Sequence, residues 1–146
     1  METTTPTDMA VLERYSRAAI EPEAALCCPV DYDPKYLAAI PSEVLERDYG
    51  CGDPSRHVRE GETVLDLGSG SGKICFIASQ IVGPAGRVIG VDANDDMLAL
   101  AVRCRGEVGD RIGFHNVEFR KGRIQDLALD LALVDAWLAD RPISSV

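Results

Sequence analysis

After an irregular N-terminal part, apolar and polar residues alternate in blocks that predict strands and helices in regular order. Short apolar runs predict buried strands at Thr63 to Leu67, Arg87 to Val91 and Val117 to Arg120. Apolar positions at helical spacing predict a helix from Lys73 to about Val82, and another that Asp95 caps and that ends near Glu107. This order of elements predicts a parallel sheet with right-handed crossovers.

The N-terminal part predicts several short helices. Asp8 can cap an amphipathic helix from Met9 to about Ala19, with Val11, Leu12 and Tyr15 facing inward. Two shorter helices and a glycine-rich loop follow, at Lys35 to Ile40, Glu43 to Asp48 and Tyr49 to Pro54. We expect these pieces to cover the sheet rather than to form a separate domain.

The predicted fold is therefore α/β: a Rossmann-like parallel sheet within residues 61–146, with a helical cap formed by residues 1–60. A last helix is expected from Ala128 to about Ala139. In a complete doubly wound sheet the first strand is central, but with three strands it lies at an exposed edge. Buried parallel strands tolerate such an edge poorly. We therefore expect either the N-terminal portion of a longer enzyme, truncated after strand three, or a domain whose exposed sheet edge a partner or a second copy covers.

Three alternating glycines come directly after the first strand. They are Gly68, Gly70 and Gly72. A triphosphate-binding loop would need glycine at the position of Leu67 and a hydroxyl residue at that of Ile74. A dinucleotide fingerprint would need its third glycine at the position of Lys73. Both spacings fail, which disfavours nucleoside triphosphates, NAD and FAD as ligands.

The pattern that remains, from Asp66 to Gly72, resembles motif I of the class I S-adenosylmethionine-dependent methyltransferases. In that family the acidic residue at the end of strand one, here Asp66, lies near the ammonium group of the cofactor. Asp92 ends strand two, about 20 residues past the loop, where a carboxylate can accept both ribose hydroxyls. Residues Gly122 to Asp126 stand where the family lines the adenine. The resemblance implies S-adenosylmethionine as cofactor, bound by Asp66, Gly68, Ser69, Gly70, Gly72, Asp92, Ala93, Ile124 and Gln125.

A second pattern narrows the resemblance. The hexapeptide from Arg47 to Gly52, Arg-Asp-Tyr-Gly-Cys-Gly, precedes the first strand and is similar to arsenite S-adenosylmethionine methyltransferases. Two further segments share this similarity, Ser79 to Gly83 and Val91 to Asn94. The resemblance implies methyl transfer to thiolate-bound trivalent arsenic. It nominates Cys51, with one or both of Cys27 and Cys28, as the residues that bind arsenic.

The proposed acceptor suits thiol ligands, because trivalent arsenic is soft and prefers thiolate to oxygen or nitrogen. Its lone pair can attack the methyl group in line, so no catalytic general base is expected. Other family members use further cysteines after strands four and five, beyond Val146. The segment Tyr15-Ser16-Arg17 also departs from the Tyr-Tyr-Gly of some members. Methylation of another small molecule, or cofactor binding without catalysis, therefore stays open.

Composition restricts the partners and the location. The 146 residues suffice for one domain, and the net charge of -9, from 24 acidic and 15 basic residues, disfavours binding to a nucleic-acid backbone. No apolar run approaches a membrane span of roughly 20 residues, and Met1 to Pro6 lack the features of a secretory signal. The chain contains five cysteines, which in a cytoplasmic protein are expected to be reduced.

The other cysteines are expected to be inert. Cys75 and Cys104 fall on predicted helices, where a thiol is usually buried. A zinc site is not expected, because the available ligands lack the CxxC spacing of structural zinc sites. Those ligands are Cys27, Cys28, Cys51 and His57.

Overall fold

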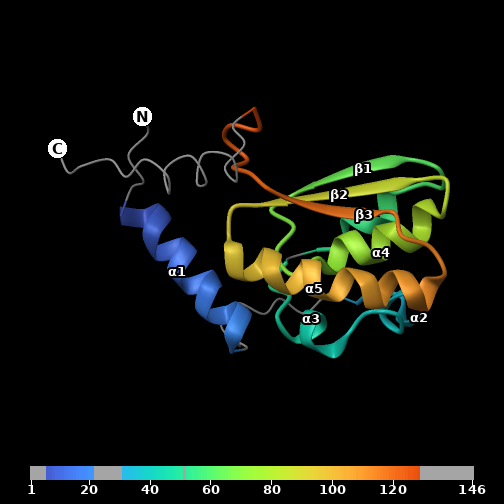
Figure 1. The fold of residues 1–146 in the computed structure, drawn as a ribbon, viewed down its shortest axis with the longest axis horizontal. Coiled ribbons are helices and arrows are strands. Elements are labelled where there is room, and N and C mark those ends of the chain that lie inside the picture. Colours follow the sequence, from blue (N-terminus) through green and yellow to red (C-terminus); the bar gives the residue numbers. More distant parts are fainter. Residues whose placement is uncertain (1–5, 22–30, 51, 129–146) are drawn as a thin grey trace.

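A computed structural model describes residues 6–21, 31–50 and 52–128 (Figure 1). Its centre is a three-stranded parallel sheet in the order β1-β2-β3, formed by Thr63–Leu67, Arg87–Asp92 and Val117–Lys121. Leu65 pairs with Ile89, which in turn pairs with Glu118. The parallel α/β fold predicted from the sequence is confirmed, and β1 lies at an edge of the described sheet.

Helices α4 (Lys73–Val82) and α5 (Asp95–Ile112) cover the same face of the sheet (Figure 1). Alternate strand residues point toward them, because successive side chains of a strand face opposite sides. Val88 is fully buried against α4, and the rings of Phe76 and Phe119 meet edge to face at 5.7 Å between centroids. The main core therefore lies between the sheet and these two helices.

The opposite face of the sheet has no helix over it among the described residues (Figure 1). Leu65 and Leu67 of β1 point to this side and are 52% and 45% exposed. Toward β3 the same face is polar, with an ion pair of 2.9 Å between Arg87 and Glu118. The sheet thus has one packed face and one face that exposes apolar side chains at its β1 edge.

Glycines set the limits of α4, which begins and ends where the sequence predicts. Gly72 precedes it with φ 94°, and Gly83 ends it with φ 72°. Few side chains adopt such positive φ values, so glycine marks both ends.

The prediction for α5 is wrong in two details. Asn94, not Asp95, is its N-cap: the side-chain oxygen of Asn94 accepts hydrogen bonds from the N–H groups of Asp96 and Met97, both at 3.0 Å. The helix also continues past Glu107 to Ile112. The reason is packing, because Val108 and Ile112 extend the apolar stripe into the core.

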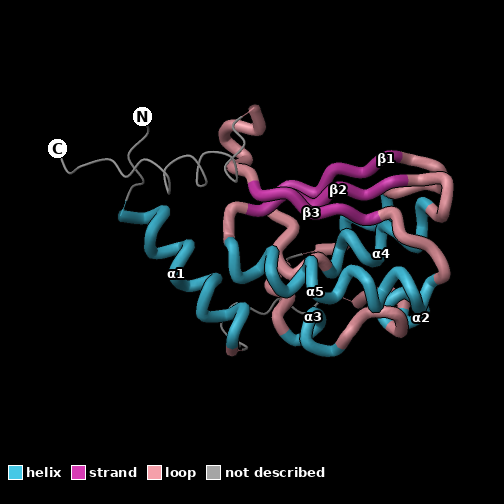
Figure 2. The backbone as a smooth tube through the Cα atoms, in the orientation of Figure 1, coloured by secondary structure: helices cyan, strands magenta, loops and turns pink. Residues whose placement is uncertain are grey.

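The N-terminal helices form a further layer beyond α4 and α5, as Figure 2 shows for α2 (Pro34–Leu37) and α3 (Ser42–Glu46). Asp33 caps α2, and its carboxylate accepts a hydrogen bond from the N–H of Lys35 at 3.0 Å. Buried Ile40 and Val44 belong to the same apolar cluster as Phe76 of α4. The short 3-10 helix η2 (Pro54–His57) then leads into β1. The N-terminal segment and the sheet therefore share a core.

Helix α1 (Pro6–Ile20) begins before the predicted cap, Asp8, and buries only part of the face that was expected to point inward. Val11 and Leu12 are 51% and 44% exposed. The helix instead packs through Tyr15 and the buried Ala18 against Tyr49 and Met97. Tyr15 faces inward as predicted, but Val11 and Leu12 do not, because the helix contacts its neighbours along a narrow strip centred on Tyr15 and Ala18.

Several sequence-based predictions fall outside the described residues. They concern Cys27, Cys28, Cys51 and the last helix beyond Ala128. Within the described part of the chain, no helix is long and apolar enough to cross a membrane.

Candidate cofactor site

The loop between β1 and α4 passes the carboxyl edge of the sheet. An added Cβ at Gly72 would lie 2.7 Å from the Phe119 ring, so any larger residue would displace a core aromatic. At Gly68 and Gly70, by contrast, an added Cβ would meet no atom within 4 Å. The loop is therefore packed at its helix end and open on the side where a ligand can approach.

Backbone hydrogen bonds attach this loop to β2. The N–H groups of Gly68 and Ser69 donate to the carbonyl of Val91 at 2.7 and 3.0 Å. The next N–H along the loop, that of Gly70, donates to Oδ2 of Asp92 at 2.8 Å. The glycine loop and the end of β2 thus form one continuous edge.

Asp92 stands at the centre of this edge. Its Oδ1 accepts from the N–H of Asn94 at 2.8 Å, and its carbonyl accepts from the N–H of Gly122 at 3.0 Å. An ionised carboxylate has about four acceptor positions, so both oxygens keep capacity for ligand hydroxyls. Because Asn94 caps α5, Asp92 is not needed for that task.

Asp66 lies on β1 on the side facing α4 and is partly buried. Burial raises the pKa of its carboxyl, the hydrogen bond from Cys75 opposes this, and the nearby charges of Asp92 and Asp48 raise the pKa further. The Cys75 thiol donates to Oδ2 of Asp66 at 3.3 Å. Because Asp48 is paired with Lys73, it is Asp66 and Asp92 that give this region a negative potential, which favours a cationic ligand group.

The loop also contains an unpaired buried polar atom. Ser69 is 8% exposed, and its Oγ has no hydrogen-bond partner among the described residues. Leaving a buried hydroxyl unpaired costs about 1–3 kcal/mol. Together with the space beside the loop glycines and the carboxylates of Asp66 and Asp92, this hydroxyl fits a polar, partly cationic ligand such as S-adenosylmethionine.

The segment after β3 reaches the same edge. The hydrogen bond from Gly122 to Asp92 fixes its start, and a bridge between Arg123 and Asp126 closes its turn. Ile124 within the turn is 58% exposed, and Gln125 is exposed beside it. Ala93, directly after Asp92, is exposed as well. The predicted cofactor residues therefore come from β1, the glycine loop, the end of β2 and the turn after β3, and they share one edge of the sheet.

The structure places two of the five cysteines, and both are buried, as expected. Cys75 and Cys104 are 0% and 2% exposed. Burial, reinforced by Asp66, raises the pKa of the Cys75 thiol well above its ordinary value. Burial and then Glu43 raise the pKa of Cys104 to about 12. Only thiolates bind soft ions strongly, so neither residue suits arsenic.

Sequence reasoning missed a buried ion pair beside the loop. Lys73, the first residue of α4, pairs through Nζ with Oδ2 of Asp48, and the two side chains are 10% and 14% exposed. The position of this lysine in the sequence, at the start of a predicted helix, could have indicated the ion pair. A cation at a helix N-terminus is disfavoured by the helix dipole and therefore calls for a nearby carboxylate.

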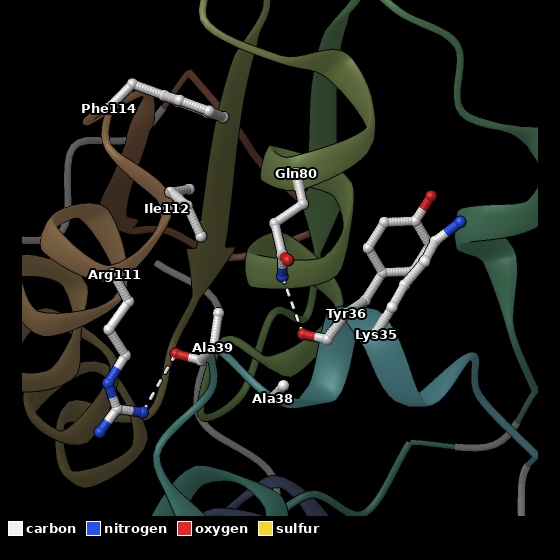
Figure 3. A pocket seen from close by; sticks show the side chains of 8 residues that line it. All are labelled: Lys35, Tyr36, Ala38, Ala39, Gln80, Arg111, Ile112 and Phe114. Atoms are coloured by element: carbon white, nitrogen blue, oxygen red, sulfur yellow. Dashed lines mark hydrogen bonds between the residues drawn. The ribbon is translucent and has the colours of Figure 1, made fainter.

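A separate open cavity of about 610 Å³ lies at the other end of α4 (Figure 3). Gln80 donates there to the carbonyl of Tyr36 at 2.8 Å, and Arg111 donates to that of Ala39 at 3.3 Å. The remaining cation, Lys35, pairs with Asp33 at 3.3 Å. The polar side chains that line the cavity thus already have partners within the protein. The cavity lies at the opposite end of α4 from the glycine loop.

Comparisons with known proteins match this chain to methyltransferases. A family model described as a methyltransferase domain matches residues 58–146. An arsenite methyltransferase from Aquipseudomonas alcaligenes is 43% identical over 115 residues, which are 75% of this chain and 33% of that protein. A ubiquinone/menaquinone biosynthesis C-methyltransferase from Legionella pneumophila is 41% identical over 71 residues, which are 49% of this chain and 27% of that protein.

Among solved structures, an arsenic(III) S-adenosylmethionine methyltransferase from Chlamydomonas reinhardtii superposes with a TM-score of 0.61 at 37% identity. The match covers 67% of this chain and 34% of that one. The chain thus spans about a third of the length of the relatives it matches. The family model covers more than half of the chain, and S-adenosylmethionine, the cofactor predicted from the glycine loop, is in keeping with it. The chain belongs to the methyltransferase domain family.

Proposed function

We propose that this chain binds S-adenosylmethionine at the carboxyl edge of its sheet and takes part in methyl transfer to thiolate-bound trivalent arsenic. The observation that carries the cofactor part is the position of Asp92. Its carboxylate accepts hydrogen bonds from N–H groups of the glycine loop and of the N-cap of α5. Its backbone carbonyl accepts one from the N–H at the start of the turn after β3. A ligand that spans this edge would contact all three segments at once.

Each part of the edge has a distinct role in this proposal. The carboxylate of Asp92 accepts the ribose hydroxyls, and that of Asp66 attracts the ammonium group. The unpaired Oγ of Ser69 is a hydrogen-bonding group for the amino-acid end. Exposed Ile124 and Gln125 offer an apolar surface and a polar side chain for the adenine.

When bound, the cofactor supplies an electrophilic methyl group on a positively charged sulfur. The chain's own residues orient it, because the loop fixes one end and the turn after β3 the other. Alignment of this kind accounts for much of the acceleration in a transfer between two bound groups. No proton has to be removed from arsenic, so the site needs no general base.

The proposal of arsenic as acceptor rests on the relatives and on the cysteine pattern. The relatives named as arsenite or arsenic(III) methyltransferases match at 43% and 37% identity. Cys75 and Cys104 are buried with raised pKa values, which leaves Cys51, Cys27 and Cys28 as candidate ligands.

The cofactor site can be tested by titration calorimetry. We expect Asp92→Ala to weaken S-adenosylmethionine binding by about tenfold or more, the cost of losing hydrogen bonds to a charged acceptor. Asp96→Ala is the matched control, since it removes an exposed carboxylate from the first turn of α5. Equal affinity of the Asp92→Ala variant and the unaltered chain would contradict the assignment.

The acceptor can be tested through Trp137, the single tryptophan of the chain. Arsenite titration should change its fluorescence, and Cys51→Ser should weaken the response by about tenfold, as expected when one of the soft ligands is lost. Cys104→Ala is the control, because this thiol is buried. An identical response in the Cys51→Ser variant would remove Cys51 from the site.

A second candidate function is methylation of a different small molecule. The similarity to the C-methyltransferase of Legionella pneumophila favours it, because that protein matches half of the chain at 41% identity. Binding of S-adenosylmethionine without any arsenite response would support this alternative.

A further inference from the structure

Lys73 is buried at the junction of the glycine loop and α4. The residue is 8% exposed, its Nζ pairs with Asp48, and the same Nζ lies 3.9 Å from the centre of the Tyr32 ring. A carboxylate and an aromatic face are both favourable partners for a desolvated ammonium group. The first residue after the cofactor loop is therefore bound to two residues of the N-terminal segment.

Both partners of Lys73 lie beside the segment that carries Cys51. Asp48 precedes this cysteine by three positions in the chain. The hydroxyl of Tyr32 donates to the carbonyl of Gly52, the residue after Cys51, at 2.8 Å. Lys73 therefore connects to the chain on both sides of the cysteine.

Two further hydrogen bonds hold the same segment. The hydroxyl of Tyr49 donates to the carbonyl of Ala18 in α1 at 3.0 Å. From the glycine loop, the hydroxyl of Ser71 donates to the carbonyl of Val44 at 3.2 Å. The loop that faces the cofactor and the segment around Cys51 are thus joined at Ser71 and at Lys73.

Stability alone is a weak explanation for this ion pair. A buried ion pair contributes little net stability relative to a well-packed apolar pair, because desolvation offsets the attraction. What the pair supplies is a fixed geometry, since a charge-assisted hydrogen bond has a preferred distance and angle and an apolar contact does not. Methyl transfer needs a fixed geometry, because an error of about 1 Å between reacting groups can cost about 100-fold in rate.

We propose that Lys73 is a positioning residue that holds the Cys51 segment in register with the cofactor loop, and so sets the place of the arsenic acceptor. This inference rests on the proposed function, which supplies both ligands. It also assigns a use to the Gly72-Lys73 pair, which lacks the spacing of a phosphate loop. The ammonium group acts inside the protein, on Asp48 and Tyr32, rather than on a ligand phosphate.

The test compares Lys73→Met, Lys73→Arg and Arg103→Met by calorimetry with S-adenosylmethionine and with arsenite. Arg103→Met is the matched control. It breaks the pair with Glu43, which also joins the N-terminal segment to the sheet domain, but at an exposed site where the side chains are 63% and 39% exposed.

We expect Lys73→Met to bind S-adenosylmethionine with one molecule per chain and nearly unchanged affinity, while its arsenite affinity falls by about tenfold or more. Lys73→Arg should recover most of the arsenite affinity, and Arg103→Met should leave both affinities unchanged. Hydrogen exchange of the backbone amides at Gly50 and Gly52 should accelerate in the Lys73→Met variant alone. If that single variant fails to fold, a double variant with Asp48→Asn, which removes both charges, carries the same expectations.

Unchanged arsenite affinity in the folded Lys73→Met variant would overturn the inference. So would a parallel loss of both affinities that Arg103→Met reproduces, because that pattern indicates general destabilisation. If the unaltered chain binds S-adenosylmethionine but no arsenite, the proposed acceptor is wrong and the inference falls with it. Arsenite binding by the unaltered chain therefore tests the proposed function. The difference in arsenite affinity between the unaltered chain and the variants tests the role of Lys73.

Discussion

Ionisation of Asp66 lowers the stability of the cofactor-free protein. Its pKa is raised above the ordinary 3.8, mainly by burial and further by the charges of Asp92 and Asp48, while the Cys75 hydrogen bond lowers it. Below the ordinary value the carboxyl is protonated in both folded and unfolded chains, so it has no effect on stability. As the pH rises through the folded pKa, ionisation destabilises the native state, and the full cost applies above it.

Asp66→Asn should therefore stabilise the cofactor-free protein at neutral pH, by about 0.5–2 kcal/mol, the range typical of single stabilising substitutions. The gain should shrink as the pH falls toward 3.8, since the native carboxyl then becomes neutral. Urea unfolding at several pH values measures this. The same variant should lose affinity for S-adenosylmethionine, and a variant that is less stable yet binds normally would contradict the assignment.

At the residue scale, the sequence predicted which acidic residues and glycines lie at the carboxyl edge of the sheet. It did not predict which side chains pair with one another there. Asp66 and Asp92 were predictable because both follow from short-range spacing around a glycine loop. The pairing of Lys73 with Asp48 joins residues 25 positions apart, and no local pattern specifies it. The arsenic-binding role of Cys51 stays a prediction, since it lies outside the described residues.

Among the elements, α5 and α1 meet at Asn94. Its side-chain oxygen caps α5, while its Nδ2 donates to the carbonyl of Leu12 at 3.1 Å and to Oγ of Ser16 at 3.0 Å. One amide thus has two functions, and substitutions can separate them. The oxygen stabilises a helix terminus, and the nitrogen holds α1 beside the cofactor edge.

Asn94→Ala should lose both functions and destabilise the protein by about 1–2 kcal/mol, the cost of a lost N-cap. Asn94→Asp keeps the capping oxygen but has no donor for α1. We expect it to retain most of the stability measured in urea, while hydrogen exchange in α1 increases. Equal exchange in α1 for the unaltered chain and both variants would show that the amide does not hold this helix.

Element limits were predictable where glycine or a cap fixes them locally. The bounds of β1 and α4 match the prediction, because Gly68, Gly72 and Gly83 mark them. The end of α5 and the buried face of α1 were not predictable in the same way. Both depend on packing against distant residues, such as Tyr49 for α1.

For the whole molecule, the main feature is a sheet face that carries no helix among the described residues. Leu65 and Leu67 expose about half of their surface there, at the edge strand β1. Exposed apolar side chains beside unpaired strand groups favour association with another chain. Covering of this edge by a second copy or a partner stays a prediction from the sequence.

We expect the chain to associate as its concentration rises, and Leu65→Lys to shift the association midpoint upward by about tenfold, as a buried charge on the contact face would require. Sedimentation velocity over a wide concentration range measures this. Val102→Lys is the control, because Val102 is 46% exposed on α5, away from this face. A monomer at every concentration would contradict the prediction.

The order of the strands in the sheet has a consequence for folding. Each strand pairs with the next one in the chain, and only one helix separates successive strands. Each pairing therefore spans a single helical crossover, whereas a strand order that skipped a neighbour would have to close a longer loop. During synthesis, β1 and α4 can pack as soon as β2 emerges, before the residues after β3 exist. The spatial order of the three strands thus also gives the order in which the cofactor edge can assemble.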